Sequence, residues 1–369
     1  MLDFTSALYL AMDHGSRSLR PWQALTTGRP AALESPPGAV AVAADLARLI
    51  GCDQATLGTS TLHIFFDLFE MLGAEDIALF VDAGIYPIAR WGVERAASKG
   101  VPVTMFPAHD PIALEHALAR KWRSGGRSVI VTDGLSTATG RPAPLDRYLP
   151  LVRARRGYLV VDDTQALGVL GERPSRAEPY GRGGGGTCAW YGLRAPELIV
   201  VSSLSKGFGV PLAVLAGSSG LIQKFEASGS CRVHCSAPSA AHISAAEHAL
   251  ALNHSHGASL RRRLALGVQR FRQHLLNAGL PVSGGFFPVQ TPSLGGSAEA
   301  IHAELLANGI RSVLHQRKSG SPALLSFLIS AEHQPWEIDG AAEILCQAAS
   351  QRKNRMGFTH HEQFADLYP

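Results

Sequence analysis

Short apolar stretches alternate with longer segments of helical periodicity through the first two thirds of the chain. Apolar runs bounded by turn residues predict strands at residues 77–81, 101–106, 128–132, 158–161, 198–201 and 213–216. The segments between them predict helices at residues 61–72, 87–99, 112–124 and 145–155. This alternation predicts an α/β fold, in which helices cover both faces of a mostly parallel central sheet.

The pattern changes beyond about residue 245. A helix rich in Ala, His, Leu and Arg is expected at residues 243–278, followed by short strands containing Gly and Pro and by a helix at 336–351. We therefore predict an N-terminal segment, a large domain, a smaller C-terminal α+β domain and a polar tail, at residues 1–30, 31–245, 246–350 and 351–369. The glycine-rich stretch at residues 181–186 predicts a mobile loop, because it lacks the Lys-Ser/Thr of a P-loop.

Composition places the chain among globular proteins. Hydrophobic residues make up 46% of its 369 residues and charged residues 17%. The formal net charge is only +4 and the basic residues are scattered, which argues against a nucleic-acid partner. The N-terminus lacks a basic leader pattern, and no stretch reaches the ~18 apolar residues of a membrane span. We expect a cytoplasmic protein with no membrane span.

The five cysteines predict neither disulfides nor a metal site. Only Cys231 and Cys235 are close together in the sequence, with His234 beside them. No second Cys/His pair with zinc-ligand spacing follows, so we expect no metal.

Three predicted strands end in residues that can carry chemistry. These are Asp133, the pair Asp162 and Asp163, and a Ser-Leu-Ser-Lys run that ends at Lys206. In parallel sheets covered on both faces, ligands bind outside the carboxyl ends of the strands. The site is therefore expected at this edge.

Lys206 stands one short turn past a buried strand, among hydroxyls and glycines. An isolated loop lysine is usually solvated. Here Ser203 and Ser205 can donate to a phosphate, while Gly207 and Gly209 allow close approach of the backbone. A lysine that condenses with an aldehyde needs such a defined location and a lowered pKa.

Asp162 ends its strand where a carboxylate could pair with a protonated ring nitrogen. Such a pairing keeps a pyridinium ring charged, so that the ring acts as an electron sink. Asp163 could equally cap a helix or a turn, so the acidic pair alone is ambiguous.

Together, Asp162 and Lys206 carry a family resemblance that runs from residue 2 to residue 333. The most specific stretches are residues 131–145, the segment that begins at Asp162, and residues 196–209. The chain resembles the α-oxoamine synthases, which are pyridoxal-phosphate (PLP) enzymes of the fold type I, or aspartate aminotransferase, superfamily. The resemblance implies a PLP-dependent transferase fold and a homodimer with the active site at its interface.

The resemblance also implies a role for each matching residue. Lys206 holds the cofactor as a Schiff base and Asp162 meets its ring nitrogen. Tyr86 replaces the family's histidine that stacks on the ring. The remaining expected contacts are Thr137 and Gln165 near the phenolic oxygen, Ser203 and the backbone amides of Thr61 and Leu62 at the phosphate, and Ser236 at a phosphate across the dimer interface.

Three departures leave the reaction open. Gln165 stands where the family has a histidine, and Gln cannot exchange a proton. Ser326 stands where an arginine binds the amino acid's carboxylate, and Arg311, Arg317 and Lys318 are the candidates to replace it. The chain begins close to the family's first motif, without the basic segment associated with acyl-CoA recognition. The acyl donor is therefore CoA-bound, carrier-bound or absent.

Our leading hypothesis is a C-acyltransferase that condenses an amino acid with an acyl thioester, with loss of carbon dioxide. The alternative is an aminotransferase or another PLP reaction on an amine, which Ser326 and the short N-terminus favour. A catalytically silent subunit is a third reading, and the presence of Lys206 argues against it.

Overall fold

The computed structural model describes residues 1–121, 125–316 and 322–365, and side chains up to residue 352. The chain divides into two compact units. Unit 1 comprises Met1–Tyr9, Thr137–Arg141 and Arg262–Pro369, and unit 2 comprises Leu10–Ser136 and Pro142–Arg261. Each unit is described by itself.

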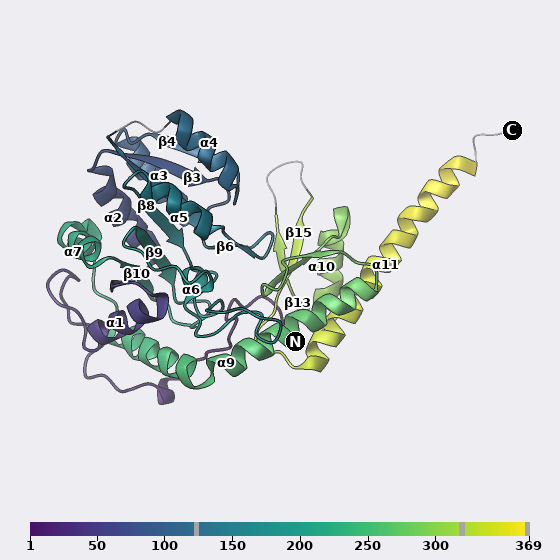
Figure 1. Cartoon of the computed structure of the whole chain (residues 1–369). Helices are drawn as coiled ribbons and strands as arrows, with labels where there is room; N and C mark the ends of the chain where they lie inside the picture. Colours follow the sequence, from purple (N-terminus) through teal and green to yellow (C-terminus); the bar gives the residue numbers. More distant parts are fainter. Residues whose placement is uncertain (122–124, 317–321, 366–369) are drawn as a thin grey trace. The chain divides into compact units, whose positions relative to one another are not determined.

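Unit 2 is built on a sheet that has seven strands among the described residues, in the order β2-β10-β9-β8-β5-β3-β4 (Figure 1). Only β10 runs antiparallel to its neighbours in this described sheet. This arrangement confirms the predicted α/β fold with a mostly parallel sheet. The strands are β2 (Gln54–Gly58), β3 (Ile77–Asp82), β4 (Val103–Phe106), β5 (Arg127–Asp133), β8 (Tyr158–Asp162), β9 (Leu198–Ser203) and β10 (Ala213–Gly217).

Helices cover both faces of this sheet because its central strands are apolar on both sides. Val129, Val131 and Val160 belong to one core cluster with α2 (Thr61–Gly73), α3 (Pro87–Ser98) and α7 (Ser219–Ser228). The alternate residues Ile130 and Val161 are also fully buried and point to the other face. The helices outside that cluster that contact the strands are α1 (Ala39–Ile50), α4 (Pro111–Lys121) and α5 (Leu145–Arg153).

Shorter elements complete unit 2. They are the 3-10 turn η1 (Ser16–Ser18), α6 (Gly186–Trp190), α8 (Ser230–His234), and the two-residue strands β6 (Leu135–Ser136) and β7 (Arg141–Pro142), which flank the turn at residues 137–140. The long helix α9 (Ala240–Asn277) begins in unit 2 and continues into unit 1.

Unit 1 is an α+β unit, as predicted for the C-terminal part. Its described residues form a four-stranded sheet in the order β11-β12-β15-β14, and β1 pairs with β13. The elements are β1 (Leu2–Asp3), β11 (Val282–Ser283), β12 (Val289–Pro292), η2 (Gly295–Ser297), α10 (Ala298–Ala307), β13 (Ile310–Arg311), β14 (Val313–His315), β15 (Leu324–Leu328) and α11 (Pro335–Ala365).

Three predictions of organisation need correction. The division between the units falls inside α9, between Arg261 and Arg262, and not at residue 245, because the helix is continuous across the change in composition. The expected polar tail from Gln351 is helical as far as Ala365, because α11 continues through it. The N-terminal segment also divides at Tyr9, where β1 and its flanking residues join unit 1.

The glycine-rich stretch is packed at both ends, while Arg182 and Gly183 between them are exposed; its expected mobility stays a prediction. Gly184, Gly185 and Gly186 are buried, and Gly184 accepts a hydrogen bond from the Gly168 amide over 2.7 Å. A Cβ atom on Gly186 would overlap the Asp163 carboxylate. The glycines therefore permit close approach of the backbone to a buried acid.

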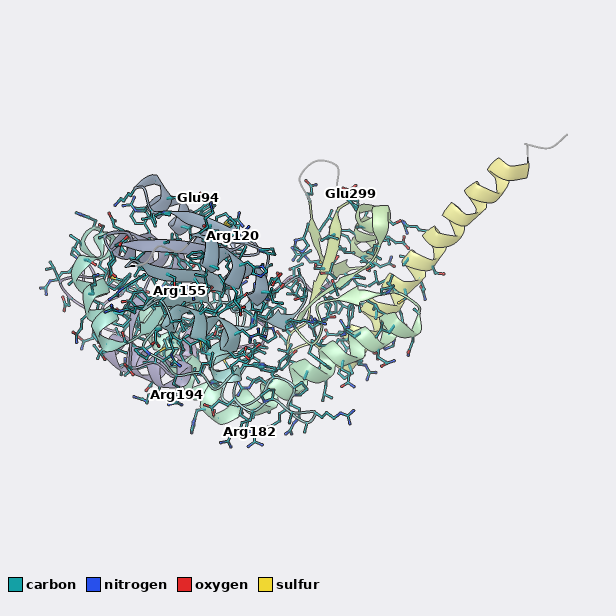
Figure 2. All side chains as sticks on the ribbon, turned by 45° about the horizontal axis from the view of Figure 1, so that its top comes forward. Glu94, Arg120, Arg155, Arg182, Arg194 and Glu299 are labelled. Atoms are coloured by element: carbon teal, nitrogen blue, oxygen red, sulfur yellow. The ribbon has the colours of Figure 1, made fainter. Side chains whose placement is uncertain are left out.

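Charged side chains are spread over the outside of unit 2. Arg182 and Arg194, for example, are 68% and 72% exposed and project from the surface (Figure 2). Among the described residues, no helix is long and apolar enough to cross a membrane. The same residues contain no group of three or more His, Cys, Asp or Glu side chains arranged to hold a metal ion.

Candidate active site

The carboxyl edge of the sheet in unit 2 collects most of the predicted site residues. Ala213 of β10 is the register partner of both Gly58 of β2 and Ser203 of β9. Asp162 of β8 is the partner of Val201 of β9. The segments that follow β8 and β9 therefore emerge side by side, about 4.8 Å apart, and the segment that follows β2 emerges at the same edge beyond β10.

Lys206 lies just past β9 and is partly buried. Burial lowers the pKa of its ammonium group, while the carboxylates of Asp162 and Asp133 act in the opposite direction. A lysine with a lowered pKa carries a larger fraction of the neutral amine, which is the nucleophilic form. This pKa shift suits the role that the sequence predicts for Lys206, and the role itself stays a prediction.

Asp162 is 7% exposed, and its Oδ1 accepts a hydrogen bond from the Thr164 amide over 3.1 Å. Burial raises the pKa of this carboxyl, and the Thr164 hydrogen bonds and the charge of Lys206 oppose the rise. The Thr164 hydroxyl accepts a hydrogen bond from the Ser203 amide over 3.0 Å. This bond connects the end of β9 to the segment after β8.

Tyr86 lies at the start of α3 with its side chain 55% exposed. Its ring centroid is 6.0 Å from Lys206 Nζ, and its amide donates to both carboxylate oxygens of Asp133 over 3.1 Å. More than half of the Tyr86 side chain is therefore accessible to a ligand beside the lysine.

The sequence marked Asp133 only as a residue at the end of a strand. In the structure it lies beside Asp162 and binds the Tyr86 amide, so it belongs to the candidate site. Burial raises its pKa to about 8, and the Asp162 charge adds to the rise. The strand-end aspartate was the available signal, but its register partner could not be read from the sequence.

Two hydroxyls and a helix start make up the polar side of this edge. The Ser203 and Ser205 hydroxyls are 2.8 Å apart. Helix α2 begins with Ser60 as its N-cap, whose hydroxyl accepts from the His63 amide over 3.4 Å. Thr61 and Leu62 open the first turn, where backbone N–H groups have no acceptor within the helix and attract anions.

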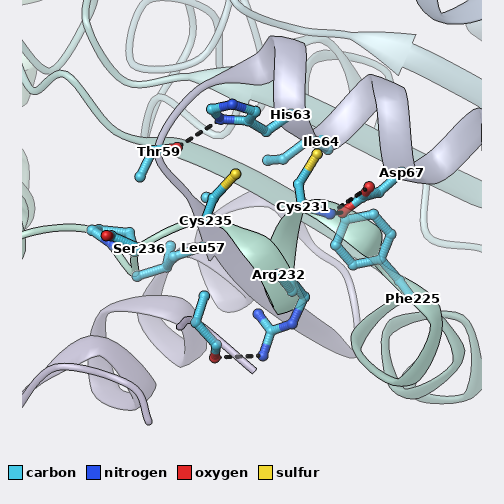
Figure 3. A pocket seen from close by; sticks show the side chains of 13 residues that line it. Leu57, Thr59, His63, Ile64, Asp67, Phe225, Cys231, Arg232, Cys235 and Ser236 are labelled. Carbon is cyan, nitrogen blue, oxygen red and sulfur yellow. Dashed lines mark hydrogen bonds between the residues drawn. The ribbon is translucent and has the colours of Figure 1, made fainter. Parts of the chain in front are cut away.

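Ser236 lines a separate small cavity of about 30 Å³ in unit 2, together with Thr59 and His63 (Figure 3). The Thr59 hydroxyl lies 2.8 Å from His63 Nδ1 at its wall. Ser236 thus lies near the start of α2. Its expected role across a dimer interface stays a prediction.

The sequence left two roles open for Asp163, a cofactor contact beside Asp162 or a cap of a helix or turn. Its contacts in the structure agree with a cap. It is fully buried and accepts the Thr187 amide, at the start of α6, over 2.9 Å. Burial raises its pKa to about 6. Gln165 follows in the same turn and is half-buried.

The remaining predicted residues belong elsewhere. Thr137 is exposed in a turn assigned to unit 1, where a Cβ atom on Gly140 would overlap the Gly284 carbonyl. Ser326 of β15 is 2% exposed, and its hydroxyl lies 2.7 Å from Thr291 Oγ1 and 3.0 Å from His315 Nε2. Arg317 and Lys318 lie outside the described residues.

Comparisons with known proteins agree with the family resemblance seen in the sequence and with the fold. The sequence profile described as "Aminotransferase class I and II" matches residues 33–343. An 8-amino-7-oxononanoate synthase from Methylococcus capsulatus is 33% identical over 250 residues, 66% of this chain and 60% of the relative. One from Pseudomonas aeruginosa PAO1 is 27% identical over 324 residues, 86% of this chain and 71% of the relative. The match to a third, from Alkalilimnicola ehrlichii, again spans 60% of the relative's length.

Solved structures share the fold. Serine palmitoyltransferase from Sphingomonas wittichii superposes with a TM-score of 0.81 at 16% identity, covering 95% of this chain and 87% of the other. The 8-amino-7-oxononanoate synthase of Francisella tularensis gives 0.70 at 18% identity, covering 96% and 99%. The sequence resemblance is thereby confirmed. Since the profile spans most of the chain, the chain belongs to the aminotransferase class I and II family.

Proposed function

We propose that the protein is a PLP-dependent C-acyltransferase of the α-oxoamine synthase type, which joins an amino acid to an acyl thioester with loss of carbon dioxide. The observation that carries the proposal is the pairing of Lys206, whose pKa is lowered by burial, with the buried carboxylate of Asp162 at one sheet edge. The names of the relatives, 8-amino-7-oxononanoate synthases, support the reaction class.

The residues at this edge fit PLP. Burial raises the pKa of the Asp162 carboxyl, and a protonated ring nitrogen beside it would stabilise its charged form. The exposed Tyr86 ring offers a stacking surface, and Ser203, Ser205 and the start of α2 offer donors to a phosphate. When bound, PLP supplies an electron sink for charge that develops at the amino acid's α-carbon.

Each residue of the candidate site would then have its own role. Lys206 Nζ would bind the cofactor's aldehyde and afterwards move a proton to and from the α-carbon. Asp162 would keep the ring nitrogen protonated, and Tyr86 would orient the ring. Ser203, Thr61 and Leu62 would hold the phosphate, while Thr137 and Gln165 would approach the phenolic oxygen.

Assembly and substrate range belong to the same proposal. The protein would act as a cytoplasmic homodimer, with Ser236 approaching the partner's cofactor phosphate. The amino substrate would be a small-molecule amino acid, and the acyl group would arrive on CoA or on a carrier protein. Arg317, or else Arg311 or Lys318, would replace the family's carboxylate-binding arginine. The Ser326 hydroxyl at that position is engaged by Thr291 and His315.

An aminotransferase is the second candidate, and the contacts of Ser326 favour it. A residue that should bind a carboxylate is instead a neutral hydroxyl used within a sheet. A keto acid formed from an amino donor in the absence of any thioester would identify this reaction.

The test has two parts. Protein incubated with PLP is reduced with borohydride and digested, and mass spectrometry should find the cofactor on Lys206 and nowhere in a Lys206→Ala variant. A panel of amino acids and acyl thioesters is then assayed for free thiol and carbon dioxide. Release of both, dependent on Lys206, supports the condensation, and release of neither across the panel contradicts it.

A further inference from the structure

His14 connects two segments that are far apart in the sequence, both within unit 2. Its Nε2 lies 2.7 Å from the carbonyl oxygen of Phe208, and its Nδ1 lies 3.0 Å from Nδ1 of His248 on α9. The two imidazole rings meet edge to face, with centroids 5.2 Å apart. Phe208 is the second residue after Lys206, and its side chain is fully buried.

Hydrogen bonding constrains the tautomer of His14. A carbonyl oxygen only accepts, so His14 Nε2 carries the hydrogen that it donates to Phe208. In neutral His14 the other nitrogen is then an acceptor, and His248 Nδ1 must donate to it. His248 therefore orients His14 so that a hydrogen points at the lysine loop.

Other contacts hold the His14 segment against α9. Arg20 forms a bidentate ion pair with Glu247, with both bonds 2.9 Å long. Ser244 Oγ donates to the Arg20 carbonyl over 2.8 Å, and the Ala240 amide donates to the Leu25 carbonyl over 2.9 Å. His14 is thus supported by a segment with several attachments to the helix.

The loop after Lys206 needs such support because its own backbone is permissive. Gly209 adopts a φ of +65°, and Gly207 lies so close to the Leu167 carbonyl that a Cβ atom would overlap it. The loop is closed by the Val210 amide, which donates to the Leu204 carbonyl over 3.1 Å. Within this loop, the Phe208 carbonyl oxygen accepts the hydrogen bond from His14.

We propose that His14 is a positioning residue for Lys206, which it holds through the Phe208 carbonyl, and that His248 on α9 sets the orientation of His14. The function of this device rests on the proposed role of Lys206. His14 touches neither Lys206 nor a reacting atom directly in this arrangement; it fixes the backbone that carries the lysine.

The experiment compares His14→Ala, His14→Gln and His248→Ala with His254→Ala, a substitution of an exposed histidine on the same helix. Hydrogen exchange of the amides at residues 204–210 is measured in the cofactor-free proteins. The rate of borohydride-fixable PLP attachment to Lys206 is measured separately. Gln is the conservative variant, because its amide N–H can donate to the same carbonyl.

We expect His14→Ala to raise exchange in this segment by about threefold to tenfold, the range for loss of one net hydrogen bond, and to slow attachment. His14→Gln should restore most of the protection, His248→Ala should show a smaller increase, and His254→Ala should match the parent. Unchanged exchange in both His14→Ala and His248→Ala overturns the proposal. An increase spread evenly over the whole chain also overturns it. If His14→Ala does not fold, His248→Ala decides the outcome.

The two proposals fail separately. If the parent protein does not acquire PLP at Lys206, the proposed function fails, whatever the exchange rates are. If the parent acquires PLP and the exchange of residues 204–210 is insensitive to His14 and His248, the positioning role fails alone.

Discussion

Asp133 and Asp162 are register partners on the parallel strands β5 and β8, so two carboxyl groups lie side by side at the edge of the sheet beside Lys206. Burial raises the pKa of both carboxyl groups, and the charge of Asp162 adds to the rise at Asp133. The pair links the candidate cofactor residue to Tyr86, whose amide is bound by Asp133.

The carboxyl pair predicts a pH dependence of stability in the cofactor-free protein. A folded-state pKa of about 8 for Asp133, against 3.8 ordinarily, means that the folded state holds a proton that the unfolded state has lost. The free energy of unfolding should therefore fall as the pH rises from about 4 to 8. Asp133→Asn should remove on the order of 1–3 kcal/mol of this fall between pH 6 and 8. Denaturant unfolding at several pH values measures it, and parallel pH profiles for parent and variant would contradict it.

Tyr86 should matter for the ligand and little for folding, because its side chain is 55% exposed. Tyr86→Ala is expected to weaken PLP binding about fivefold, since stacking contributes about 1 kcal/mol. Tyr86→Phe and Tyr86→His should bind PLP within about threefold of the parent, because both retain a ring. Fluorescence titration gives the affinities, and equal affinity of the Ala and Phe variants would rule out stacking.

The glycine-rich segment offers a matched pair of substitutions. Gly183 and Gly186 have φ values of +81° and +83°, but only at Gly186 would a Cβ atom overlap the Asp163 carboxylate. Gly183→Ala should therefore cost about 1–2 kcal/mol from the backbone conformation alone. Gly186→Ala should cost about 2 kcal/mol more, in the range typical of overpacking. Thermal and urea unfolding compare the two, and equal losses would mean that Asp163 moves freely out of the way.

Ser326 should contribute to the stability of unit 1 through its two hydroxyl contacts. Ser326→Ala removes a partner from the half-buried Thr291 hydroxyl and from the exposed His315 ring, at a cost of about 0.5–1.5 kcal/mol for each hydrogen bond lost. Ser283→Ala is the control, because its exposed hydroxyl donates to the Thr291 carbonyl in the same sheet and should change stability by less than about 0.5 kcal/mol. Urea unfolding checks both. A loss for Ser326→Ala no larger than for the control would show that the hydroxyl is dispensable to the sheet.

Much of the fold could be predicted because its signals are local. The predicted strand at residues 77–81 is β3 (Ile77–Asp82), and the predicted helix at 61–72 is α2 (Thr61–Gly73). In both cases hydrophobic periodicity and flanking turn residues lie within one element. The division at residue 245 was wrong because a change of composition inside a continuous helix does not mark a boundary between units.

The candidate site also contains some features that have a local sequence signal and others that have none. The sequence by itself determined that a lysine among hydroxyls and an aspartate stand at strand ends, because each signal lies within a few residues of Lys206 or Asp162. Only the tertiary structure decided that Asp133 lies beside Asp162, that Gly186 approaches Asp163, and that His14 binds the Phe208 carbonyl. These contacts depend on strand order and on where α9 packs, and both are set by burial of apolar surface across the whole unit, which no local pattern encodes.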